Sequence, residues 1–252
     1  MKSIAHFNAL LAFSLAAHAD ATVTEKVTQS FAVNSDVVIS LENVNGDIDI
    51  TAWDKAEVSL VADKRAKDDE GLHRLEISID AEPAHLAIKT KHAKKSGFSF
   101  FGGWNDNSSV RYKLMVPAAA KLEKIDAVNS DITVSGVRGP VSLETVNGGI
   151  EATGLVGDAK LESVNGRLRA EFASLGRVDH VSMESVNGRV EVTLPKGAGA
   201  TIKTSSVNGS SNIDQAIKLS KSGRHGISGD IGTGGPRITL ETVNGSISVK
   251  EK

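Results

Sequence analysis

The chain has 252 residues, a formal net charge of −2, 40% hydrophobic residues and only 4% aromatic residues. It contains no cysteine, which excludes disulfides, thiolate chemistry and a lipid-modified N-terminal cysteine. The balanced charge gives no indication of a nucleic-acid partner. The composition therefore predicts a narrow core of aliphatic side chains.

The first 19 residues resemble an export signal. Lys2 provides a basic start, Ala9–Ala17 form an apolar run, and Ala17–Ala19 form a small-x-small cleavage site. The apolar run is too short to cross a bilayer as a helix of the mature protein. We expect a signal peptide at 1–19 and one domain at 20–252, which is periplasmic or extracellular and is not an integral membrane protein.

A Val-Asn motif recurs seven times along the chain. The asparagines are Asn45, Asn129, Asn147, Asn165, Asn187, Asn208 and Asn244. Their spacings are 84, 18, 18, 22, 21 and 36 residues, so the middle of the chain has a period of 18 to 22 residues. Gly follows each Asn except Asn129, which Ser130 follows. Apolar residues mostly stand four before and three and five after Asn, and an acidic residue mostly stands three before it.

Two structures are compatible with these motifs. Asn-Gly is the strongest local signal for a β-hairpin, and such hairpins would form a propeller or meander. A hairpin, however, would set Glu144 directly against Glu151, which is unfavourable. If the chain instead turns a corner at Asn-Gly, with Gly supplying a positive φ, Val can point inward with the other apolar residues. We therefore predict an all-β, single-stranded parallel β-helix with one rung per 18 to 22 residues.

Stacked rungs would also explain the asparagines. Equivalent side chains on successive rungs lie about 4.8 Å apart, and each amide both donates and accepts hydrogen bonds. The seven asparagines are therefore predicted to form a structural ladder along the stack.

The segment at about 54–112 interrupts the repeat. Its alternating stretches predict further strands, either as degenerate rungs or as a sheet that caps the β-helix. It also contains a basic and aromatic loop whose residues are Lys91, Lys94, Lys95, Phe98, Phe100, Phe101 and Trp104. This loop at 89–104 is interpreted either as a cap over the end of the β-helix or as a surface that contacts a partner, such as an anionic lipid headgroup or a polysaccharide.

A second irregular segment, Gln215–Pro236, is rich in glycine. It lacks the order of a phosphate-binding loop, because no Gly-x-x-x-x-Gly-Lys-Ser/Thr motif occurs in it. We interpret it as a rung with a bulging loop.

No catalytic constellation stands out in the sequence. The histidines of the expected mature chain, His73, His85, His92, His180 and His225, show no metal-ligand spacing. We assign no catalytic residue, cofactor or metal. The weak candidate for a metal is an acidic column at Glu144, Glu162 and Glu184, which is interpreted either as a solvated face partly neutralised by basic neighbours or as a calcium site.

Several stretches resemble a known family. They are VNGDIDITAWDKAEVSL, VPAAAKLEKIDAVNSDITVSG, VTLPKGAGATIKTSSVNG and GDIGTGGPRITLETVNGSISV. Together they are similar to the bacterial putative-adhesin family, a domain of unknown function with repeated Asn-Gly turns. The resemblance covers about Val23 to Val249. It implies a β-solenoid, an exported or envelope-facing location and no established enzymatic activity.

Three functional hypotheses follow. The first is a non-enzymatic cell-envelope solenoid that serves as an adhesion, scaffold or binding module for an envelope protein, a glycan or an anionic surface. The second is a carbohydrate-active β-helix enzyme, a lyase or hydrolase, which would have to use the column Glu144, Glu162 and Glu184. The third is an envelope signalling accessory protein that another protein contacts.

Overall fold

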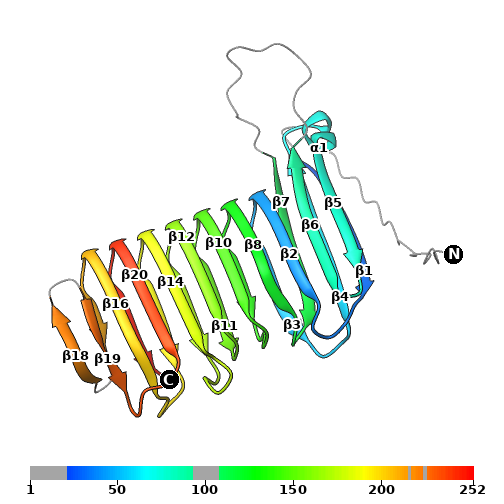
Figure 1. Cartoon of the computed structure of the whole chain (residues 1–252). Helices are drawn as coiled ribbons and strands as arrows, with labels where there is room; N and C mark the ends of the chain where they lie inside the picture. Colours follow the sequence, from blue (N-terminus) through cyan, green and yellow to red (C-terminus); the bar gives the residue numbers. More distant parts are fainter. Residues whose placement is uncertain (1–21, 93–107, 215–216, 224–225) are drawn as a thin grey trace.

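A computed structural model describes residues 22–92, 108–214, 217–223 and 226–252 of the chain. Within these ranges the protein is almost entirely β-structure, arranged as an elongated stack of strands (Figure 1). The strands form an eleven-stranded and a ten-stranded sheet, and the inward side chains of both sheets build one apolar core. The prediction of an all-β fold is confirmed.

The spatial order of the strands in both sheets differs from their order in the chain. The eleven-stranded sheet contains, from one edge to the other, β18 (Ile217–Gly223), β19 (Gly226–Ile231), β16 (Ala200–Asn208), β20 (Arg237–Asn244), β14 (His180–Asn187), β12 (Ala159–Asn165), β10 (Val141–Asn147), β8 (Lys121–Asn129), β2 (Val38–Asn45), β6 (His85–His92) and β5 (Leu75–Glu82). The ten-stranded sheet contains β1 (Val23–Ala32), β4 (Glu57–Ala66), β7 (Ser109–Pro117), β3 (Ile48–Trp53), β9 (Ile132–Ser135), β11 (Ile150–Leu155), β13 (Leu168–Phe172), β15 (Val190–Leu194), β21 (Ile247–Glu251) and β17 (Ser211–Ile213).

Each asparagine corner joins a strand of the eleven-stranded sheet to the next strand of the ten-stranded sheet, and we call such a pair a rung. Neighbouring rungs pair in parallel and in register, so that Leu161 of β12 lies opposite Leu143 of β10 and Met183 of β14. The corners and the parallel stacking agree with the prediction. The single-stranded parallel β-helix is too simple a description, because the strands form two open sheets and three of their four edge strands pair in antiparallel fashion.

The order of the last two rungs differs from the expectation that successive rungs stack. The C-terminal rung, β20 and β21, lies between the rung β14–β15 and the rung β16–β17 (Figure 1). Asn244 therefore stands opposite both Asn187 and Asn208. The rung β16–β17 thus lies nearer the end of the stack than the C-terminal rung, although it comes earlier in the chain.

The N-terminal end of the stack is an antiparallel cap. Strands β6 and β7 pair in parallel with β2 and β3, and β5, β4 and β1 then add in antiparallel fashion. A short helix, α1 (Asp69–Arg74), begins after Asp68, whose side chain accepts a hydrogen bond from the Gly71 amide. The irregular segment at about 54–112 thus contributes strands β6 and β7, which pair in parallel with the first rung, and strands β4 and β5, which add in antiparallel fashion.

The C-terminal end of the stack corrects the interpretation of Gln215–Pro236. This segment contributes a hairpin, β18 and β19, that pairs antiparallel with β16, and it is not a further rung. An antiparallel hairpin covers the edge of β16 that a further rung would otherwise use.

The residue before each asparagine does not point inward, contrary to the prediction. Six of the seven valines are among the exposed large apolar side chains, with exposures from 36% at Val146 to 57% at Val207. The alternation of the strand continues to its last residue, so the residue two before Asn, for example Thr145 or Ser163, is the buried one. The premise that Val must be buried was wrong, although the corner that it supported is present.

The corner glycines serve mainly to allow close approach. Among the glycines that follow a motif asparagine, a positive φ in the left-handed range occurs at Gly46 and Gly148. At Gly166 an added Cβ would lie 1.8 Å from the Gly148 carbonyl oxygen, and at Gly188 it would lie 1.8 Å from that of Gly166. A side chain is excluded at these corners because the backbone of the neighbouring rung occupies its place.

Candidate functional site

The seven asparagines form one continuous column of hydrogen-bonded side chains. Asn165 donates from Nδ2 to Oδ1 of Asn147 at 2.9 Å and accepts from Nδ2 of Asn187 at 2.8 Å. The same pattern continues to both ends of the column, and the last amide, that of Asn45, donates to the Ser108 carbonyl at 3.2 Å. Six of the seven side chains are exposed, so the column forms an outer seam of the stack.

A second ladder lies beneath the seam. The buried hydroxyl two residues before each of five asparagines donates to a corner carbonyl of the neighbouring rung, as Thr145 does to Ser130 and Ser163 to Gly148, both at 3.0 Å. At the first rung the amide of Asn43 takes this place and donates to the Val110 carbonyl at 2.8 Å. These bonds give the buried hydroxyls acceptors on the neighbouring rung and link the rungs to one another.

The acidic column is present on the outer face of the eleven-stranded sheet. Six carboxylates stand opposite one another on consecutive strands: Glu42, Asp126, Glu144, Glu162, Glu184 and Glu241. We call them the acidic row. Equivalent positions on adjacent strands lie about 4.8 Å apart, so these like charges need solvent or cations nearby.

Lysines neutralise part of the acidic row. Lys160 lies 2.9 Å from Glu162, and this hydrogen bond raises the pKa of the lysine. Lys89 and Lys124 both contact Glu42 and hold the pKa of its carboxyl below its ordinary value. Ion pairs between the row and the corner arginines Arg167 or Arg189 are absent from the described residues; Arg189 instead donates to Ser246.

The row does not assemble a metal site in the part of the chain that the structure describes. No group of three or more His, Asp or Glu side chains there is arranged to hold a metal ion. Glu144, Glu162 and Glu184 stand on consecutive strands, as predicted, but they form a line along the sheet and do not surround a common point.

The exposed valines form a second row beside the acidic row. We call Val128, Val146, Val164, Val186, Val243 and Val207 the valine row. Each valine follows the acidic position by two residues, so both side chains leave the same face of the strand. Between the two rows lies an open groove of about 350 Å³, and its walls include Glu144, Glu184, Val164 and Val186.

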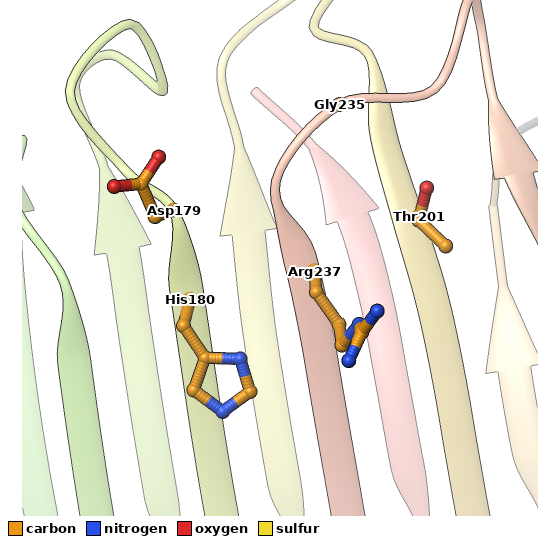
Figure 2. Close-up of a pocket in the computed structure, with 5 residues that line it drawn as sticks. All are labelled: Asp179, His180, Thr201, Gly235 and Arg237. Carbon is orange, nitrogen blue, oxygen red and sulfur yellow. The ribbon is translucent and has the colours of Figure 1, made fainter.

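A second, polar hollow lies at the opposite ends of these strands. It has a volume of about 320 Å³ and is lined by Asp179, His180, Thr201, Gly235 and Arg237. Figure 2 shows the His180 and Arg237 side chains directed the same way from the adjacent strands β14 and β20, while the Asp179 carboxylate points away from both. Thr201 donates to Asp230 at 2.7 Å, so its hydroxyl is already engaged.

Most of the basic and aromatic loop falls outside the described residues. Of its candidate contact residues Lys91 belongs to β6, and Lys94, Lys95, Phe98, Phe100, Phe101 and Trp104 lie outside the described ranges. Whether the loop caps the stack or contacts a partner stays a prediction.

Sequence reasoning located the acidic row but missed the valine row. The signal was available, because Val stands at an odd distance from the buried residue four before Asn, and an uninterrupted strand alternates with period two. The assumption that the alternation resets at the corner concealed it.

Comparison with known proteins agrees with this architecture. The model of the Toastrack DUF4097 family matches residues 29–250. The chain belongs to this family. No curated protein matches it.

Two solved structures illustrate the similarity to proteins of low sequence identity. A putative cell adhesion protein of Clostridium sporogenes has a TM-score of 0.52 at 16% identity, over 90% of this chain and 100% of that one. A putative adhesin of Bacteroides fragilis has a TM-score of 0.40, also at 16% identity, over 90% and 97% of the two chains. The likeness to the Clostridium sporogenes protein, at 16% identity, is one of fold. The described residues include no helix that is long and apolar enough to span a membrane.

Proposed function

We propose that this toastrack protein is a non-enzymatic, exported module of the cell envelope that binds or scaffolds other molecules through the outer face of its eleven-stranded sheet. The observation that carries the proposal is the groove between the acidic row and the valine row. Surface valines that stand singly are ordinary, whereas six on consecutive strands form a continuous apolar line. The description of the Clostridium sporogenes protein as a putative cell adhesion protein supports the adhesion part of this proposal.

Direct binding tests this function. The purified protein is immobilised and exposed to fractionated envelope proteins and to an array of surface glycans, beside a variant that carries Val164→Ser and Val186→Ser. We expect a component that the wild-type protein retains and the variant loses. Retention that is equal for both proteins would place the binding surface elsewhere, and turnover of a polysaccharide by the purified protein would contradict the non-enzymatic assignment.

The competing function is carbohydrate cleavage, and one feature favours it. Retaining glycosidases use two carboxylates about 5 Å apart, close to the strand spacing that separates Glu162 from Glu184. Every two neighbouring carboxylates in the acidic row have this spacing, however, so it does not single out an acid and a nucleophile. If Glu162→Gln and Glu184→Gln abolished a measurable depolymerisation, the enzymatic function would replace the proposed one.

A further inference from the structure

The groove on the eleven-stranded sheet runs across five strands. Its acidic wall crosses β10, β12, β14 and β20 with one carboxylate from each strand and ends with Ser205 on β16. All of these strands except β10 add a valine to the other wall. The acidic wall contains the acidic row from Glu144 to Glu241, and the other wall contains the valine row from Val164 to Val207. A ligand that uses both walls must therefore lie along the stack, across the strands.

The two walls demand different chemistry from that ligand. The valine wall requires an apolar edge, because its methyl groups are otherwise left in water. On the acidic wall, Glu144 and Glu184 have no cation within ion-pair distance among the described residues. The lysines that serve Glu162 and Glu241 are Lys160 and Lys203, which precede the acidic positions by two residues and so lie on the side away from the valines. The groove side of the acidic row can thus accept basic groups from a partner.

The repeat of side chains along each wall indicates which secondary structure of a partner fits the groove. Strands repeat about every 4.8 Å across the sheet, and an α-helix repeats about every 5.4 Å along its axis. A helix laid along the groove can present about one basic and one apolar side chain per strand. An extended peptide repeats its side chains on one face about every 6.8 Å and loses register after two strands. Five strands span roughly 19 Å, which corresponds to about 13 helical residues.

We propose that the groove binds a basic amphipathic helix of a partner protein, with its apolar edge on the valine row and its basic edge on the acidic row. This inference rests on the proposed function and names the chemistry of the partner. The binding mode is that of a helix in a groove, with anchors about one turn apart. The acidic wall disfavours an anionic membrane or an anionic glycan as occupant of this groove.

A synthetic helix tests the proposal. The probe is a fluorescent alanine-based peptide of about 14 residues, with one lysine and one leucine per turn on adjacent faces. Fluorescence anisotropy measures its dissociation constant with the purified protein. We expect saturable binding that weakens as salt is added, because the ion pairs at the groove are exposed. A peptide of identical composition in which lysine and leucine alternate is expected to bind about tenfold more weakly, because its period fits a strand.

Matched variants locate the site. Val164→Ser and Glu184→Gln are each expected to weaken the binding of the helical peptide several-fold, and the double variant about tenfold. The controls lie on the ten-stranded sheet: Met115→Ser removes a side chain that is 42% exposed, and Glu151→Gln removes a carboxylate from its outer face. Both controls should bind as the wild-type protein does. Circular dichroism verifies that each variant is folded.

The outcomes separate the two proposals. The proposal of a bound helix would be rejected if the helical and the alternating peptide bound with equal affinity. It would also be rejected if the groove variants and the control variants lost the same affinity for the helical peptide. Sedimentation that shows a dimer disrupted by Val164→Ser would overturn it too, since a second copy would then occupy the groove. Retention of an envelope protein or glycan that depends on Val164, without peptide binding, would reject the helix and keep the proposed function. Peptide binding without any envelope component would reject the envelope function and keep the helix site.

Discussion

In the middle of the eleven-stranded sheet, from β2 to β16, neighbouring strands pair in parallel, whereas both ends of this sheet, and the β1 end of the ten-stranded sheet, are closed by antiparallel strands. Parallel pairing in register places each residue opposite its equivalent, so Asn meets Asn and Glu meets Glu. Antiparallel pairing brings unlike residues together, as in the partly buried contact of Lys64 on β4 with Glu25 on β1 at 2.7 Å. Ladders therefore occur only in the middle, while the ends depend on individual contacts.

This difference also explains how the stack terminates. A parallel rung offers its neighbour the same side chains and the same unpaired backbone groups, so nothing in it opposes the addition of a further rung. The hairpin β18–β19 and the strands β1 and β5 lack the asparagine motif and end this propagation at three of the four sheet edges, and the fourth edge is the short strand β17. The comparison predicts that perturbations of the middle act through the neighbouring rung, and that perturbations of the ends act locally.

The largest expected effect comes from a corner glycine. Gly166→Ala would force a Cβ to within 1.8 Å of the Gly148 carbonyl oxygen, so the rungs must move apart. We expect a loss of about 3 kcal/mol in the free energy of unfolding, measured with urea. Gly176→Ala is the control, because the nearest atom to its added Cβ lies at 3.6 Å and belongs to a side chain. Equal midpoints of urea unfolding for the two variants would contradict the role of close packing between rungs.

The next effect concerns the single tyrosine, near the N-terminal end. Tyr112 is fully buried, and burial raises its pKa to about 12, from an ordinary value of 10.0. The folded state thus holds this proton more tightly than the unfolded state. Its contribution to stability is complete below about pH 10 and is lost as the pH rises through about 12, by roughly 2 kcal/mol.

Absorbance titration of the phenol checks this, since the chain contains one tyrosine. The transition should move toward pH 10 in urea and disappear in Tyr112→Phe, whose stability should also decline less between pH 10 and 12. A folded-state transition near pH 10 would show that the end of the stack is open to water.

A smaller effect is expected from the asparagine ladder. Asn165→Ala removes hydrogen bonds to both neighbours, whereas Asn208→Ala, at the end of the column, removes one to Asn244. Because these amides are exposed, water replaces part of what is lost, and we expect about 1 kcal/mol for Asn165 and about half of that for Asn208. Urea unfolding of both variants measures the difference. If Asn165→Ala left the free energy of unfolding unchanged, the ladder would not contribute to stability.

The smallest expected effect is a difference in stability between two variants of the acidic row, one at its first strand and one in its middle. The hydrogen bonds from Lys89 and Lys124 lower the pKa of Glu42, so its contribution is present above the ordinary value of 4.5 and is lost as the pH falls through the lower folded value. Glu42→Gln should flatten the acid side of the stability curve by less than about 1 kcal/mol, since the pair is exposed. Glu144→Gln, which removes a carboxylate flanked by two others, should leave stability unchanged or raise it. A larger loss of stability for Glu144→Gln than for Glu42→Gln would show that the neighbouring lysines do not decide which carboxylates of the row are stabilising.

The repeated motif by itself determined the parallel stack, because a residue that recurs once per rung must meet its own copies when rungs pair in register. It thereby determined the columns of asparagine and glutamate as well. It could not determine the order of the last rungs. All rungs carry the same pattern, so β20 can pair with β14 or with β16, and only the completed structure shows that it pairs with both.

The tertiary structure also decided which side of the strand valine occupies. A corner can preserve or reset the alternation of side chains, and the backbone at Asn-Gly decides between these outcomes. Here the strand continues unbroken to the asparagine, which turns Val164 outward and Ser163 inward to the Gly148 carbonyl. The valine row, and with it one wall of the groove, follows from this continuation of the strand.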